Sequence, residues 1–120
     1  MSKQLLFLPL ILLVFLSFNC VKQPQLETVL IHSSGIGCSH CEDNIKKAVY
    51  ALEGVKEVNV DLEKKSIEVK FVPAQTNLQT IEITLTRAGY DANDKKRDPE
   101  AYENLDECCK HGWYIDFNIW

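Results

Sequence analysis

The spacing of the apolar side chains changes several times between residues 26 and 92, and this change constrains the fold more than any other feature. Apolar, β-branched runs and strict alternation predict strands, whereas apolar residues recurring every three or four positions predict helices. On these patterns we expect strands at residues 26–32, 55–62, 67–71 and 90–92, and helices at residues 39–52 and 78–88.

Turn and capping residues separate these elements. Gly54 and Gly89 stand where the two predicted helices stop, as glycine commonly does at helix ends. Residues 63–65 form a polar turn between two alternating strands, which predicts a hairpin. Thr76 or Asn77 is expected to cap the second helix.

The predicted order of elements is βαββαβ, which is the order of the ferredoxin-like fold. We therefore expect an α+β domain over residues 26–93, with a four-stranded antiparallel sheet and two helices on one face. Beyond it, residues 94–120 form a C-terminal extension. Asp98 and Pro99 are a helix-start signal, so a short helix is expected at residues 99–107.

The two ends of the chain carry separate signals. An apolar run after Lys3 matches a signal peptide over residues 1–19, because it is too short to span a bilayer comfortably. It resembles a bacterial lipoprotein signal with a loose lipobox, which implies lipidation of Cys20 and a tether over residues 20–25. Plain secretion and an uncleaved anchor are the alternatives. At the other end, residues 113–120 place Trp, Ile and Phe at alternate positions. An edge strand, a partner- or membrane-contacting tail and disorder all remain open for this tail.

Cys38 and Cys41 lie where the predicted first helix begins, in the run Gly-Ile-Gly-Cys-Ser-His-Cys. Thiolates favour soft ions such as Cu(I) and Zn(II). Two intervening residues let both sulfurs converge on one ion, and a helix start favours their negative charge. A pair of thiolates suits linear Cu(I) or Hg(II), whereas Zn(II) needs further ligands. A structural disulfide between the two is the plainer alternative.

These motifs resemble the heavy-metal-associated domain family, which includes copper chaperones, domains of copper- and zinc-exporting ATPases, and the periplasmic mercury-scavenging protein. The resemblance rests on the strand, the Gly-x-x-Cys-x-x-Cys loop and the run Ala88-Gly89-Tyr90, and it covers about residues 26–93. It implies a metal-binding role for Cys38 and Cys41. Ile36 replaces the usual family Met and is expected to anchor the loop. Tyr90 is expected either to shield the ion or to fill the core.

A second cysteine pair, Cys108 and Cys109, follows the predicted helix of the extension. This segment resembles an extension carried by some exported members of the family. Adjacent cysteines rarely bond to each other because the ring is strained. Four roles therefore stay open: completing a three- or four-thiolate site with Cys38 and Cys41, a separate soft-metal or redox pair, a disulfide to the loop, or structural packing.

The remaining polar candidates are less specific. His40 lies between the two loop cysteines and is expected to face solvent, where it would tune the site. His32 and His111 are interpreted as structural or solvated. A solvated helix face, or alternatively a docking surface for a transport partner, is formed by Glu42, Asp43, Lys46 and Lys47.

Charge and motif content narrow the function. The net charge is −4, which disfavours nucleic-acid binding because phosphate contacts need clustered Lys and Arg. The sequence carries no Ser/His/Asp set and no phosphate loop, so an enzyme is not expected. The leading hypothesis is a lipid-anchored scavenger or metallochaperone of the bacterial envelope. It would carry Cu(I), or alternatively Hg(II) or Zn(II), and serve a membrane metal transporter or P-type ATPase. A thiol–disulfide redox protein and a mercuric or zinc transport accessory protein are the alternatives.

Overall fold

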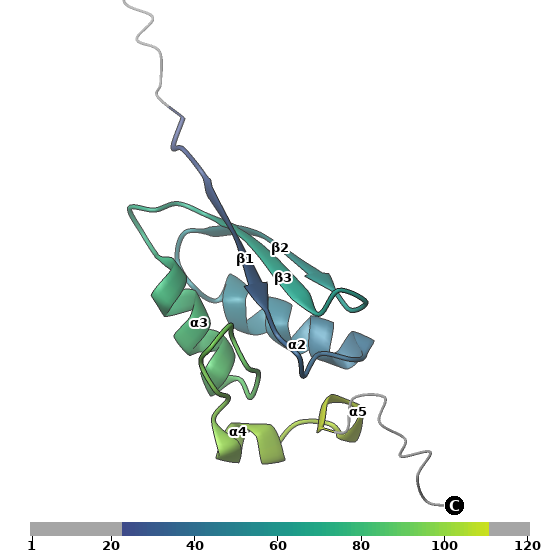
Figure 1. The fold of residues 1–120 in the computed structure, drawn as a ribbon. Coiled ribbons are helices and arrows are strands. Elements are labelled where there is room, and N and C mark those ends of the chain that lie inside the picture. Colours follow the sequence, from purple (N-terminus) through teal and green to yellow (C-terminus); the bar gives the residue numbers. More distant parts are fainter. Residues whose placement is uncertain (1–22, 111–120) are drawn as a thin grey trace, which may run out of the picture.

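A computed structural model describes residues 23–110 of the chain. Figure 1 shows a small sheet backed by two helices, with a helical extension beyond them. The strands are β1 (Glu27–His32), β2 (Val55–Asp61) and β3 (Ser66–Phe71). The helices are α2 (Ser39–Tyr50), α3 (Leu78–Arg87), α4 (Pro99–Glu103) and α5 (Glu107–Lys110). The elements predicted up to residue 88 are therefore present, with ends within about two residues.

The sheet has the order β1-β3-β2, and both neighbouring pairs are antiparallel. The predicted hairpin is confirmed, because β2 pairs with β3 across the polar turn. Lys65 closes that turn with a left-handed backbone, at φ 54°. The central strand β3 is the most regular of the three, since its side chains alternate between buried and half-buried positions.

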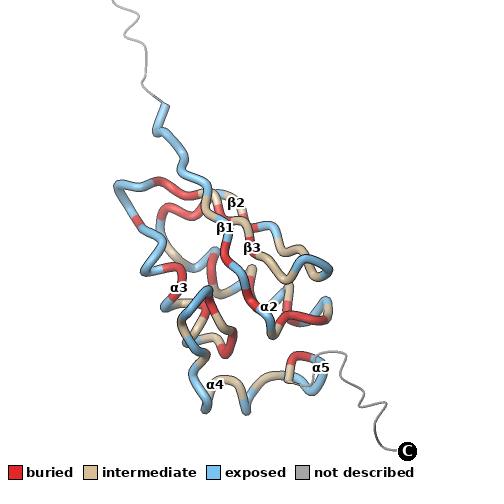
Figure 2. The backbone as a smooth tube through the Cα atoms, viewed as in Figure 1, coloured by how far each residue is buried: buried red, intermediate tan, exposed pale blue. Residues whose placement is uncertain are grey.

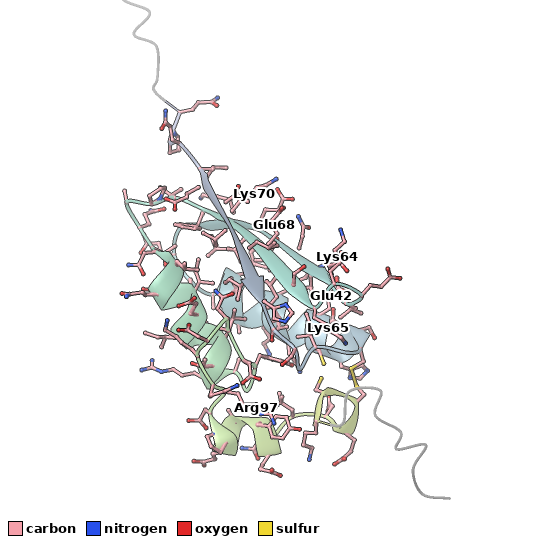
Figure 3. The ribbon with its side chains drawn as sticks, in the orientation of Figure 1. Glu42, Lys64, Lys65, Glu68, Lys70 and Arg97 are labelled. Atoms are coloured by element: carbon pink, nitrogen blue, oxygen red, sulfur yellow. A yellow bond between two sulfur atoms is a disulfide. The ribbon has the colours of Figure 1, made fainter. Side chains whose placement is uncertain are left out.

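One face of the sheet carries the core. Ile31, Ile67 and Val69 point into it and are fully buried together with residues of α2 and α3, such as Ile45 and Leu85. In Figure 2 the buried stretches lie in the strands, in α2 and α3, in the connections that join or follow these elements, and in α5. Glu68 and Lys70 of β3 extend from the opposite face (Figure 3). Both helices thus cover the same face, as the βαββ order requires.

The predicted fourth strand at residues 90–92 does not form within the described part of the chain. Tyr90 and Ala92 are buried, but Asn93 adopts a left-handed conformation at φ 55°, which an extended strand does not allow. Asn93 meets β1 at one residue only: its N–H donates to the His32 carbonyl, and its side-chain oxygen accepts from the His32 N–H. A side chain thus takes the place of a backbone ladder, and the sheet keeps three strands.

The helix predicted at residues 99–107 is two short helices, α4 and α5, separated by residues 104–106. Asp98 caps α4 by accepting from the Ala101 N–H, as the helix-start signal predicted. α4 can approach the domain closely because residue 89 is a glycine without a side chain. A Cβ there would lie 3.1 Å from the Ala101 carbonyl and 3.0 Å from Leu105 Cδ1. The φ of Gly89, 98°, also favours glycine.

Several sequence predictions concern residues outside the described range. The signal peptide, Cys20 and the first part of the tether precede residue 23, while His111 and the aromatic tail follow residue 110. They stay predictions. Within residues 23–110, the helices are too short or too polar to cross a membrane.

Candidate metal centre

The loop before α2 brings two predicted ligands together. Cys38 immediately precedes the helix with an extended backbone, at φ −143° and ψ 168°. Cys41 lies in the first turn, and its N–H donates to the Cys38 carbonyl at 3.1 Å. The two Sγ atoms are 3.5 Å apart. One loop-to-helix turn therefore directs both thiols to the same place.

Ile36 anchors this loop, as predicted, with its side chain fully buried in the core. Its carbonyl accepts a hydrogen bond from the Lys65 ammonium in the β2–β3 turn. The loop is therefore tied to the hairpin by a polar contact and to the core by an apolar one.

Cys38 forms a disulfide with Cys108 of α5. Figure 3 shows this sulfur–sulfur bond between the start of α2 and the extension. The two Cα atoms are 6.2 Å apart, which lies in the ordinary range for disulfides. Among the readings left open by the sequence, this is the disulfide to the loop. The alternative Cys38–Cys41 disulfide is wrong, because Cys41 keeps a free thiol.

Cys109, beside the disulfide, joins the same cluster. Its Sγ lies 2.6 Å from Cys41 Sγ and 3.7 Å from Cys38 Sγ. The sulfurs of Cys38, Cys108 and Cys109 all lie within 4.8 Å of one another. Cys41 and Cys109 are both buried, whereas Cys108 is exposed. Sulfurs from the loop, α2 and α5 thus form one cluster.

Tyr90 closes the inner side of this cluster. Its side chain is only 1% exposed, and its hydroxyl donates toward Cys109 Sγ at 3.7 Å. The same hydroxyl accepts from the Asn44 amide at 3.4 Å. Tyr90 therefore fills the core and also touches the sulfur cluster, which joins the two roles that the sequence left open.

Burial governs the ionisation of the Tyr90 hydroxyl and the Cys109 thiol. It raises the pKa of the Tyr90 hydroxyl above its usual value. Burial and the hydrogen bond with Cys41 raise the pKa of the Cys109 thiol to about 12. Cys109 therefore stays protonated at neutral pH unless a cation offsets the cost of its negative charge.

His40 faces solvent, as predicted, but it has a partner. Its Nδ1 lies 3.0 Å from Asp106 Oδ2, and both side chains are more than half exposed. This contact joins α2 to the segment before α5. His32 is also exposed, and only its backbone takes part in the contacts with Asn93.

The predicted charged face of α2 is only partly solvated. Glu42 pairs with Lys46 one turn away at 2.6 Å, and both are half-buried, while Asp43 and Lys47 are exposed.

Sequence reasoning missed two residues that contact this site, Asn44 and Asp106. Asn44 lies three residues after Cys41, on the same helix face, and that spacing could have identified it. Asp106 carried no such signal.

A ferredoxin-like α+β scaffold with clustered thiols at a loop-to-helix transition defines a class of small thiol-bearing modules. The chain belongs to the heavy-metal-associated domain family, because the profile of that family matches residues 30–91, slightly more than half of the sequence. That match includes Cys38 and Cys41 and ends before Cys108.

Individual relatives agree with this assignment. The COP-associated protein of Helicobacter felis is 44% identical over 57 residues, which are 48% of this chain and 85% of that protein. The mercuric transport protein periplasmic component of Serratia marcescens is 37% identical over 70 residues, 58% of this chain and 77% of that protein. The crystal structure of oxidized MerP from Ralstonia metallidurans superposes with a TM-score of 0.55 at 33% identity, covering 57% of this chain and 96% of that one.

Proposed function

We propose that this protein binds soft heavy-metal ions, Cu(I) foremost, through the thiolates of Cys38 and Cys41. The observation that carries the proposal is the pair of Sγ atoms 3.5 Å apart at the start of α2. Soft thiolates select Cu(I) and related ions over Mg²⁺ or Ca²⁺. The ion is cargo in this proposal, and no catalytic step is assigned to the protein.

The cellular role that we propose is a scavenger or metallochaperone of the bacterial envelope. Relatives whose names refer to mercuric transport and to a COP-associated protein support a role in metal handling. A lipid on Cys20 would hold the module at the membrane, beside a metal transporter or P-type ATPase that exchanges thiolate ligands with it. Hg(II) and Zn(II) are the alternative cargoes.

Metal binding in this proposal requires a reduced protein. Cys38 is bonded to Cys108, and a disulfide sulfur lacks the negative charge that a thiolate offers to a metal. An external dithiol supplies two electrons and two protons to the bond, is itself oxidised to a disulfide, and leaves two thiols on the chain.

The test is an anaerobic titration of the reduced full chain with Cu(I), Zn(II) and Hg(II). The Cys38→Ser/Cys41→Ser double variant is expected to lose tight binding of all three ions. Unchanged binding by that variant would contradict the proposal. The order of the three affinities in the wild-type chain identifies the preferred cargo.

One observation favours a second candidate, a thiol–disulfide exchange protein. The Cys38–Cys108 disulfide includes an exposed residue, Cys108, and the free thiol of Cys41 lies 3.5 Å from the Cys38 sulfur. An external thiolate attacking Cys108 would displace Cys38 as the leaving thiolate. Catalysis of insulin reduction by dithiothreitol separates the two functions, because a metal carrier gives no acceleration in this assay.

A further inference from the structure

The position of Cys109 is not explained by the two-thiolate site. It belongs to the extension, which lies beyond the family match at residues 30–91. Its thiol is nevertheless 2% exposed and lies against Cys41, whereas its neighbour Cys108 is exposed. The turn of α5 thus directs one cysteine of the pair inward and leaves the other at the surface.

The distance between Cys38 and Cys41 disfavours a linear two-coordinate ion. Metal–thiolate bonds are about 2.3 Å long, so linear coordination needs sulfurs separated by roughly twice that length. At the observed separation of 3.5 Å, two metal–sulfur bonds of that length would meet at the ion at an angle of about 100°. Such an angle leaves one side of the ion open to further ligands.

Cys109 lies on that open side. Its sulfur is 3.7 Å from Cys38 Sγ, close to the edge of a tetrahedron with bonds of about 2.3 Å. The 2.6 Å separation between Cys41 and Cys109 has to widen by roughly 1 Å for the same bond length. Since α5 has only four residues and Cys109 is its one buried side chain, this adjustment needs little rearrangement of the core.

We propose that Cys109 is a third thiolate ligand, so that the reduced protein encloses one soft ion between Cys38, Cys41 and Cys109. This inference rests on the proposed function and deepens it. Cys108 has a different part: it bonds Cys38 in the oxidised protein and is not a ligand in the reduced one. The extension therefore covers the site on the side of α5, and Tyr90 and Asn44 lie on the inner side of the site.

The adjacent cysteines provide a matched pair of variants. The full chain is prepared as wild type, Cys109→Ser and Cys108→Ser, reduced with a dithiol and loaded with Cu(I) under anaerobic conditions. Competition with a chromophoric Cu(I) chelator gives the affinity, and X-ray absorption at the copper edge counts the sulfurs. We expect three sulfurs in wild type and in Cys108→Ser. In Cys109→Ser we expect two sulfurs and affinity weaker by at least about 10-fold.

Three results would overturn the inference. They are wild-type affinity and sulfur count in Cys109→Ser, an equal loss in Cys108→Ser, and a wild-type count of two. The Cys38→Ser/Cys41→Ser variant separates this inference from the function on which it rests. Unchanged Cu(I) binding in that variant overturns the proposed function, whereas its loss beside unchanged binding in Cys109→Ser overturns only the third ligand.

A measurement on the wild-type chain removes any dependence on how the variants fold. Thiol alkylation of the reduced protein, followed by mass spectrometry, is carried out with and without one equivalent of Cu(I). Cu(I) is expected to slow labelling of Cys38, Cys41 and Cys109 and to leave Cys108 as reactive as before. Equal protection of Cys108, or no protection of Cys109, would contradict the proposal.

Discussion

The domain over residues 27–93 and the extension over residues 94–110 are held in place by different means. The domain has two antiparallel strand ladders and a core to which every strand and both long helices contribute. In the extension, α4 has no buried residue and α5 has only Cys109. Helices this short are not stable alone, so the extension depends on its contacts with the domain.

Besides the disulfide and the His40–Asp106 pair, these contacts include hydrogen bonds from the backbone. The Asp98 N–H donates to the Thr86 carbonyl at the end of α3, and the Arg97 N–H donates to Asp91 Oδ1, both at 2.9 Å. Within the extension itself, the Arg97 guanidinium lies over the Tyr102 ring, 3.5 Å from its centre. The sulfur cluster thus takes two cysteines from a region with its own core and two from a region that depends on its contacts with that core. Docking of the extension therefore decides whether Cys108 and Cys109 reach the cluster.

The largest expected contrast is between two leucines, one in each region. Leu85 is fully buried in the core, whereas Leu105 is partly buried against it. Leu85→Ala is expected to lower the free energy of unfolding by about 2–5 kcal/mol. Leu105→Ala is expected to cost less than about 1.5 kcal/mol because less apolar area is lost. Urea unfolding followed by circular dichroism measures both, and equal losses would contradict the comparison.

The disulfide is expected to have the next largest effect. It joins residues 70 positions apart, so removing it restores considerable entropy to the unfolded chain. Cys108→Ser is expected to lower the unfolding free energy by about 2–4 kcal/mol under oxidising conditions. Under reducing conditions the variant and the wild type should unfold at the same urea concentration. A difference that persists in reductant would mean that Cys108 stabilises the fold in another way.

Two glycines with left-handed backbones offer a sharper comparison. Gly89→Ala places a methyl group against α4, while Gly54→Ala meets the Gln75 side chain inside the domain. Each is expected to cost about 1–3 kcal/mol through backbone strain. Only Gly89→Ala should also speed amide hydrogen exchange in residues 99–110. Equal exchange in the two variants would show that the extension does not depend on this close approach.

Substitution of Glu82 is expected to change the free energy of unfolding least, and this change should depend on pH. Burial alone would raise its pKa, but hydrogen bonds from Lys95 and Asn93 outweigh that effect and hold the pKa below its usual value. A lowered folded pKa adds stability above the unfolded value near 4.5, and this stability is lost as pH falls through the folded pKa. Glu82→Gln should cost about 1–2 kcal/mol at pH 7. The difference from wild type should vanish in acid.

The control for that measurement is Glu27→Gln, which changes an exposed carboxylate on β1. It is expected to shift the unfolding free energy by less than about 0.5 kcal/mol at every pH. A similar pH signature in this control would attribute the effect to overall charge rather than to the Glu82 contacts.

Sequence by itself determined the parts of this protein that depend on local patterns. Apolar periodicity located three strands and two long helices, and the polar residues before α3 predicted its cap, since Asn77 accepts from the Thr80 N–H. The spacing of Cys38 and Cys41 placed both at one loop-to-helix transition. These features are set by neighbours within a few residues, which is why the sequence reveals them.

The tertiary structure alone decided the pairing of the cysteines, the number of strands and the break in the extension. Cys38 can reach Cys108 only because the Gly89 contact and the Asp98 hydrogen bond bring the extension back across the domain. Asn93 contacts β1 only at His32 and then turns the chain away with a left-handed backbone, so no fourth strand pairs with β1 within residues 23–110. An alternation of apolar residues could not indicate this turn. Cys108 and Cys109 are chemically identical neighbours, and only the direction of α5 exposes one and buries the other. Such outcomes depend on contacts between distant segments, whose geometry is fixed only when the whole chain packs.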